Sequence, residues 1–192
     1  MKGLARKKEL ILERERFFAN AVGSAVFEQP RISLWMILVP ILFLHFIYRM
    51  QKYKNGRLKF DEEFMATRRR AVDVAVDAVE TGVNPNIDHV VRDLGLRAAL
   101  ERPYAAWMRT LVEFYMDLLR SNGDSFDSLV RSAFRNRGNF LLTLNRLNTV
   151  EKDFYEALKP QLASTEGAAD IIATIIPHSQ RLRRELAQQI FP

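Results

Sequence analysis

The chain has 192 residues, of which 29 are Lys or Arg, 23 are Asp or Glu and none is Cys. The absence of cysteine excludes disulfides, thiolate zinc sites, iron–sulfur clusters and cysteine nucleophiles. A formal net charge of +6 is a moderate basic excess, so the placement of the basic residues is more informative than their number.

Residues 1–31 form a charged N-terminal segment, in which residues of both signs alternate with scattered apolar ones. This pattern predicts an amphipathic helix that lies either on lipid headgroups or in solvent. Gly23 and Pro30 are expected breaks before the next segment. The long charged region and the absence of a cleavage site after the apolar stretch argue against a signal peptide.

The stretch 32–48 (ISLWMILVPILFLHFIY) contains no charged residue and is bounded by Arg31 and Arg49. A helix of this length covers roughly 25 Å, at the lower end of what spans a hydrocarbon core. We interpret it as a single membrane-anchoring helix, with a re-entrant hairpin and a buried core helix as alternatives.

Four residues inside this stretch indicate how it would sit in a membrane and whether it could bind a cofactor. Pro40 lies at its centre and predicts a kink, or the turn of a re-entrant hairpin. Trp35 and Tyr48 lie where amphipathic aromatic side chains favour the headgroup level. His45 is a weak candidate for a haem ligand or a quinone contact, but it lies close enough to Tyr48 to reach the interface as a neutral imidazole.

Residues 49–60 form a basic linker after the apolar stretch. An excess of basic residues on this side predicts that the following domain is cytoplasmic. We expect anionic lipid to contact five residues, Arg49, Lys52, Lys54, Arg57 and Lys59. The triplet 68–70 (RRR) raises the possibility of nucleic-acid binding, but lipid headgroups are the closer polyanion, and we expect no nucleic-acid partner.

Residues 61–192 read as helix throughout, which predicts an all-α domain of five or six helices in a bundle. No alternation of β-branched and polar residues indicates a strand. Helix boundaries are expected at Gly82, Pro103, Asn122-Gly123, Arg137-Gly138-Asn139, Pro160 and Pro177.

The predicted helix that begins at Pro103 carries the most regular apolar stripe of the chain. Trp107, Phe114 and Tyr115 lie on this stripe. The domain has more aromatic side chains than its own centre needs, so we expect this stripe to be an exposed docking surface for a partner. The competing interpretation is that the stripe forms the core of the bundle.

No catalytic or metal-binding motif accompanies these features: we find no P-loop, dinucleotide fingerprint, nucleophile elbow, HExxH or EF-hand spacing. We therefore expect a non-enzymatic protein without cofactor or metal. The interpretation is a membrane-anchored helical adaptor or accessory subunit, whose partner is a membrane protein or a second copy of the chain. Two alternatives remain, a small redox subunit that uses His45 and a basic tether to membrane surfaces or nucleic acid.

Overall fold

The computed structural model describes residues 2–26, 62, 64–162 and 168–192, and every regular element in these ranges is a helix. The elements, in chain order, are α1 (Lys2–Val26), a helix over 64–81, α4 (Ile87–Arg92), α5 (Ala98–Arg120), α6 (Phe126–Phe134), α7 (Arg137–Leu158), the 3-10 turn η1 (Lys159–Leu162) and α8 (Ala168–Ile190). The prediction of an all-α fold is therefore confirmed for the described part of the chain.

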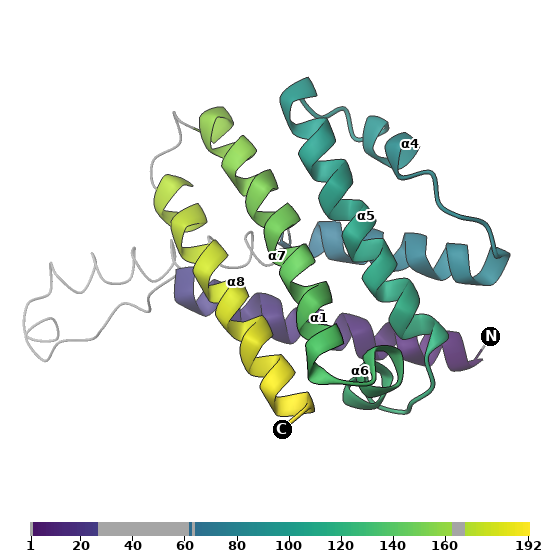
Figure 1. The fold of residues 1–192 in the computed structure, drawn as a ribbon. Helices are drawn as coiled ribbons and strands as arrows, with labels where there is room; N and C mark the ends of the chain where they lie inside the picture. Colours follow the sequence, from purple (N-terminus) through teal and green to yellow (C-terminus); the bar gives the residue numbers. More distant parts are fainter. Residues whose placement is uncertain (1, 27–61, 63, 163–167) are drawn as a thin grey trace, which may run out of the picture.

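The helices form two layers (Figure 1). Helices α5, α7 and α8 lie side by side in one layer, and α5 and α8 each pack against α7. Helix α1 and the 64–81 helix cross behind them, and α1 contacts both α5 and α8. The core lies between the two layers.

Local sequence accounts for several of the helix boundaries. The Ser125 hydroxyl accepts a hydrogen bond from the Ser128 amide in a capping box that begins α6. The Asn136 side chain accepts one from the Asn139 amide at 2.9 Å and begins α7. The break predicted between these two helices is thus confirmed.

Of the three boundaries expected at proline, the one at Pro160 is confirmed, since α7 ends at Leu158, and those at Pro103 and Pro177 were wrong. Helix α5 begins at Ala98, so Pro103 lies inside the helix, early enough that most of its hydrogen bonds are unaffected. Pro177 lies inside α8, which continues from Ala168 to Ile190 as one helix. In α8 the buried side chains Ile172, Ile175 and Ala187 hold both halves against the rest of the domain, which offsets the lost hydrogen bond.

The aromatic stripe of α5 is in the core. Trp107, Phe114 and Tyr115 are 3%, 4% and 0% exposed, so they do not form the docking surface expected from the sequence. The Phe114 ring stacks on Phe134 and on Phe140, with centroids 5.9 Å and 6.4 Å apart. The bundle absorbs these rings because the aromatic residues of neighbouring helices pack against one another.

The N-terminal helix is also part of this core and not a separate segment. Ile11 and Val22 of α1 are fully buried. Val22 lies in a second apolar cluster with Phe64 and Met65, which begin the next described helix. The face of α1 that carries Ile11 and Val22 is therefore covered by the domain, and Phe17 is its one large apolar side chain that is mostly exposed among the described residues.

Helix α1 and the 64–81 helix form an antiparallel pair. Lys8 near the start of α1 forms an ion pair of 2.8 Å with Asp73, and Val22 near its end clusters with Phe64. The end of α1 and the start of the 64–81 helix therefore lie at the same end of this pair.

No helix in the described ranges is both long and apolar enough to cross a bilayer. The predicted membrane segment, with Trp35, Pro40, His45 and Tyr48, lies outside the described residues. The basic linker 49–60 lies outside them too.

Candidate functional site

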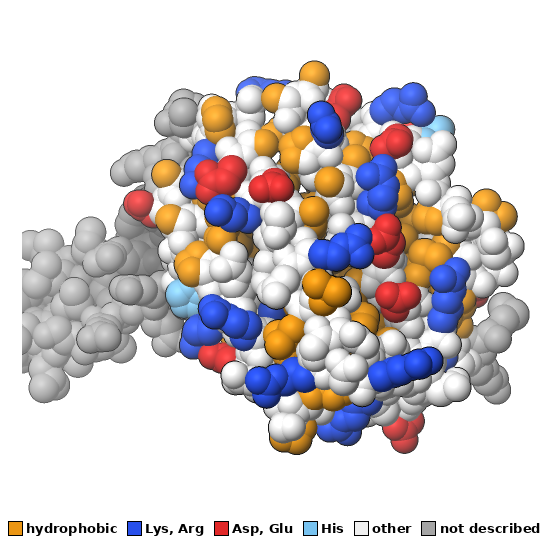
Figure 2. Space-filling model, viewed as in Figure 1, with side chains coloured by type: hydrophobic (Ala, Val, Ile, Leu, Met, Phe, Trp, Pro, Cys, Tyr) orange, Lys and Arg blue, Asp and Glu red, His pale blue; other side chains and the backbone are white. Residues whose placement is uncertain are grey.

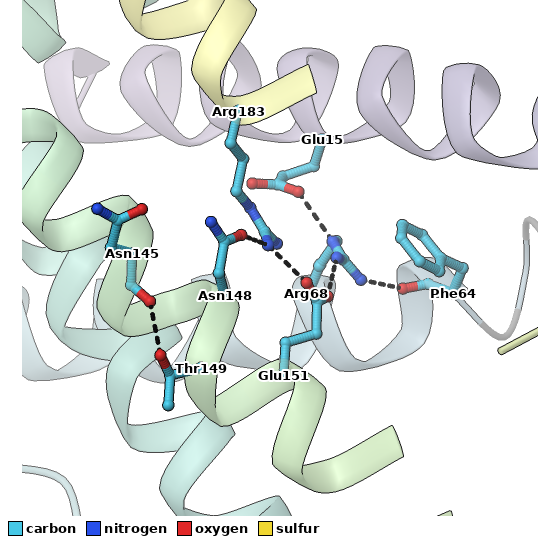
Figure 3. Close-up of polar contacts among 8 residues, drawn as sticks. All are labelled: Glu15, Phe64, Arg68, Asn145, Asn148, Thr149, Glu151 and Arg183. Atoms are coloured by element: carbon cyan, nitrogen blue, oxygen red, sulfur yellow. Dashed lines mark hydrogen bonds and ion pairs between the residues drawn. The ribbon is translucent and has the colours of Figure 1, made fainter. Parts of the chain in front are cut away.

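The most unusual feature of the domain is a cluster of four charged side chains inside it (Figure 3). Glu15 comes from α1, Arg68 from the 64–81 helix, Glu151 from α7 and Arg183 from α8. Arg68 Nε lies 3.0 Å from Glu15 Oε2, and Arg68 Nη2 lies 2.8 Å from Glu151 Oε1. Arg183 Nη1 lies 2.6 Å from Glu151 Oε2. Two positive and two negative charges thus alternate across both layers.

The guanidinium groups of Arg68 and Arg183 make further hydrogen bonds and a ring contact. Arg68 Nη1 donates to the Phe64 carbonyl oxygen at 3.0 Å, and its guanidinium lies 3.8 Å from the centre of the Phe64 ring. Arg183 Nη1 also donates to Asn148 Oδ1 at 2.6 Å (Figure 3). Such contacts offset part of the free energy that is lost when charges leave water.

The cluster is almost completely removed from solvent. Arg68, Glu151 and Arg183 are 0%, 3% and 5% exposed. Burial pushes the pKa of Glu151 upward, but Arg183 and Arg68 outweigh it and hold the pKa below its usual value of 4.5. Burial acts to lower the pKa of Arg68, and Glu151 and Glu15 raise it above its usual value. Glu151 and Arg68 therefore both keep their charge at neutral pH.

Aromatic side chains enclose the cluster. Burial raises the pKa of Tyr155 and of Tyr115, and the carboxylates of Glu151 and Glu15 respectively act in the same direction. Both hydroxyls are consequently neutral at physiological pH. The Trp107 ring lies 5.7 Å from the Arg68 guanidinium, and its Nε1 has no hydrogen-bond partner among the described residues.

A cavity of about 120 Å³ adjoins the cluster where α1 passes between α6 and α8. Glu15 and Arg183 form part of its wall. The rest of the wall is mostly apolar and includes Phe18, Leu111, Phe114, Leu147 and Leu186. Because the wall charges are already paired within the protein, an additional charge in this cavity would lack a partner.

The four side chains link α1, the 64–81 helix, α7 and α8 through three ion pairs. Each carboxylate is paired with an arginine, and the pKa of Glu151 is lowered, whereas a general acid at neutral pH needs a raised pKa. These ion pairs join α1 and the 64–81 helix in one layer to α7 and α8 in the other. Breaking the contact at either end of this series of ion pairs would leave Glu15 or Arg183 without an ion-pair partner.

No metal site is evident in the described ranges, where no group of three or more His, Asp or Glu residues gathers. His89 lies 3.1 Å from Asp93 on the surface, and His178 Nδ1 lies 3.1 Å from the Thr174 carbonyl oxygen. His45 lies outside the described residues.

The sequence interpretation missed this cluster, and for Arg68 it was wrong. Arg68 was grouped with its exposed neighbours Arg69 and Arg70 as a basic triplet, whereas it points into the core. Its spacing offered a signal, because Phe64 and Ala71 lie one helical turn away on the same buried face. Glu151 gave a similar signal as a charge inside an apolar stripe.

Comparison of the chain with models of protein families, with curated proteins and with solved structures gave no match in any of the three. Assignment of a function therefore depends on the chemistry of the chain itself.

Proposed function

We propose that the protein is a membrane-attached helical adaptor or accessory subunit. The single observation that carries this proposal is the charge-free stretch 32–48 between Arg31 and Arg49. Inserted into a bilayer, it would hold the helical domain at the surface, where the domain binds a partner membrane protein or a second copy of the chain.

The packing of α1 supports a particular topology. A single span would place α1 and the 64–81 helix on opposite sides of the bilayer. That separation would break the contact between Glu15 and Arg68 and expose the buried side chains of Val22 and Phe64. We therefore propose that the segment 32–48 enters and leaves on one side, with its turn at Pro40, in place of the single span expected from the sequence.

The end of the domain at which α1 finishes suits contact with lipid. Residues 17–26 (FFANAVGSAV) close α1 without a charged side chain, and Phe17 is 65% exposed. Beside them, residues 171–177 of α8 are uncharged. An end with few charges loses little hydration when it approaches the headgroup region.

The basic linker 49–60 supplies the electrostatic part of the attachment. Its five basic residues, Arg49, Lys52, Lys54, Arg57 and Lys59, would contact anionic headgroups, each contributing about 1 kcal/mol near the surface before screening by salt. The same excess favours the cytoplasmic side for the domain, and with a re-entrant segment also for α1.

The two alternative functions have less support in the described residues. A redox subunit would depend on His45, and no observation on the described residues adds a second ligand. A nucleic-acid tether would use the basic triplet 68–70, of which Arg68 is enclosed by the core. The two exposed arginines that remain, Arg69 and Arg70, are too few to form the basic patch that a nucleic-acid-binding surface needs.

Fractionation tests the attachment. The full chain should stay with membranes through carbonate extraction, whereas the double variant Leu38→Lys and Leu42→Lys should move to the soluble fraction, because two charges in the apolar stretch oppose insertion. The matched control is Leu142→Lys, a change at a side chain that is 65% exposed on α7. Release of the unaltered chain by carbonate would contradict the proposal.

A further inference from the structure

A second polar feature lies on the surface, in a hollow where the corner between α6 and α7 meets the end of α8. Three arginines line this hollow: Arg131 from α6, Arg135 from the connection and Arg137 from the start of α7. Ile190, Phe191 and Pro192 form its other side. Basic side chains predominate along the lower edge of the face in Figure 2, where these elements meet.

None of the three arginines forms an ion pair with a carboxylate in the described part of the chain. Arg131 Nε donates to the Ile190 carbonyl oxygen at 3.0 Å, which fixes this side chain at the hollow. Other arginines of the domain, such as Arg14 and Arg146, do pair with an aspartate or a glutamate. Three like charges around one hollow therefore lack an internal counterion.

The backbone adds to the positive potential. Helix α7 starts at the hollow and has no acidic residue in its first turn. The Asn136 side chain accepts from the Asn139 amide, which leaves the amides of Arg137 and Gly138 without an acceptor inside the helix. Unbonded amides and the helix dipole both favour an anion at this end.

We propose that this hollow binds a phosphate group, carried either by a soluble molecule or by a lipid headgroup. A phosphate monoester has close to two negative charges and three acceptor oxygens at neutral pH, which matches a site of three arginines better than a single carboxylate does. The proposal is independent of the membrane segment, since it rests on α6, the start of α7, the connection between them and residues 190–192.

The backbone at Arg135 provides a variant that removes charge without damaging the fold. Arg135 has φ 65°, in the region that favours glycine, and it is the one residue other than glycine with positive φ in the described ranges. Arg135→Gly should therefore be at least as stable as the unaltered chain in the absence of phosphate. Its loss of binding would not result from unfolding.

The test is the melting temperature of the full chain in zwitterionic detergent, measured against inorganic phosphate with chloride at matched ionic strength. Phosphate should raise the melting temperature. Arg135→Gly and Arg137→Gln should each weaken phosphate binding by about fivefold or more, because each removes a charge-assisted hydrogen-bond donor. The control Arg69→Gln with Arg70→Gln removes two exposed charges elsewhere and should leave binding unchanged.

Detergent micelles doped with phosphatidic acid or with phosphatidylglycerol then distinguish the two sources. Competition by phosphatidic acid alone would identify a lipid phosphomonoester, and binding of inorganic phosphate without such competition would identify a soluble ligand. No effect of phosphate at matched ionic strength would overturn the proposal. Equal weakening in the Arg69 and Arg70 control would overturn it too, because the effect would then be one of net charge.

Discussion

Replacement of Arg68 by methionine should destabilise the domain more than any single change on its surface. Arg68 is fully buried and contacts Glu15, Glu151 and the Phe64 carbonyl oxygen at once. Methionine fills a similar volume but leaves the Glu15 carboxylate, with 13% of its side chain exposed, without its arginine. Glu151 keeps only Arg183.

The expected loss follows from the asymmetry of buried ion pairs. Removal of one partner leaves an uncompensated charge and costs about 3–5 kcal/mol. For a chain of this size, that loss corresponds to a fall in melting temperature of about 10 °C. The double variant Arg68→Met with Glu15→Gln should recover part of the loss, since an amide is less costly to bury than a carboxylate.

Urea unfolding followed by circular dichroism measures the effect at pH 7. Arg69→Met is the matched control, an exposed neighbour that should change stability by less than about 0.5 kcal/mol. If Arg68→Met costs less than about 1 kcal/mol, the four charges do not hold the two layers together.

Three further predictions concern the same core. The lowered pKa of Glu151 stabilises the fold above pH 4.5, and this contribution should be lost as pH falls through the lower pKa of the folded state. In urea unfolding measured at a series of acidic pH values, the difference in stability between the unaltered chain and Glu151→Gln should therefore become smaller as pH falls. The raised pKa values of Tyr115 and Tyr155 predict stability that is present below pH 10.0 and lost as pH rises above it. The tyrosinate absorbance of these two residues, obtained by difference from Tyr115→Phe and Tyr155→Phe, should appear only with unfolding, and their ionisation in the folded chain near pH 10.0 would contradict their burial. Trp107→Ala should lower the free energy of unfolding by about 3–5 kcal/mol, measured by calorimetry, because the ring is buried. Loss of a co-purifying partner protein with unchanged stability would instead show that Trp107 is a surface docking residue.

The helices were predictable from the sequence because their signals are local. The apolar stripe of α5, the Asn136 cap and the break before α7 follow from residues within one or two turns. Prolines were less informative, since Pro103 and Pro177 lie in helices whose tertiary contacts outweigh one missing hydrogen bond.

The buried charge cluster was not predictable, because its four side chains come together only when the helices pack. Glu15 and Glu151 are far apart in the sequence, and although Glu151 lies within an apolar stripe, no local pattern indicates which charges it meets. The charge pattern of α1 is similarly ambiguous: the sequence suggested an interfacial segment, while Ile11 and Val22 pack against partners that local periodicity does not reveal.

The measurement that tests the proposed topology most directly is labelling of single cysteines in intact cells with an impermeant maleimide. The chain has no native cysteine, and both Gly3, where an added Cβ meets nothing within 4 Å, and Leu142, at 65% exposure, are accessible positions. Gly3→Cys and Leu142→Cys should both be protected in intact cells and both react after permeabilisation. Reaction of Gly3→Cys alone in intact cells would place α1 across the membrane from the rest of the domain and contradict the re-entrant attachment.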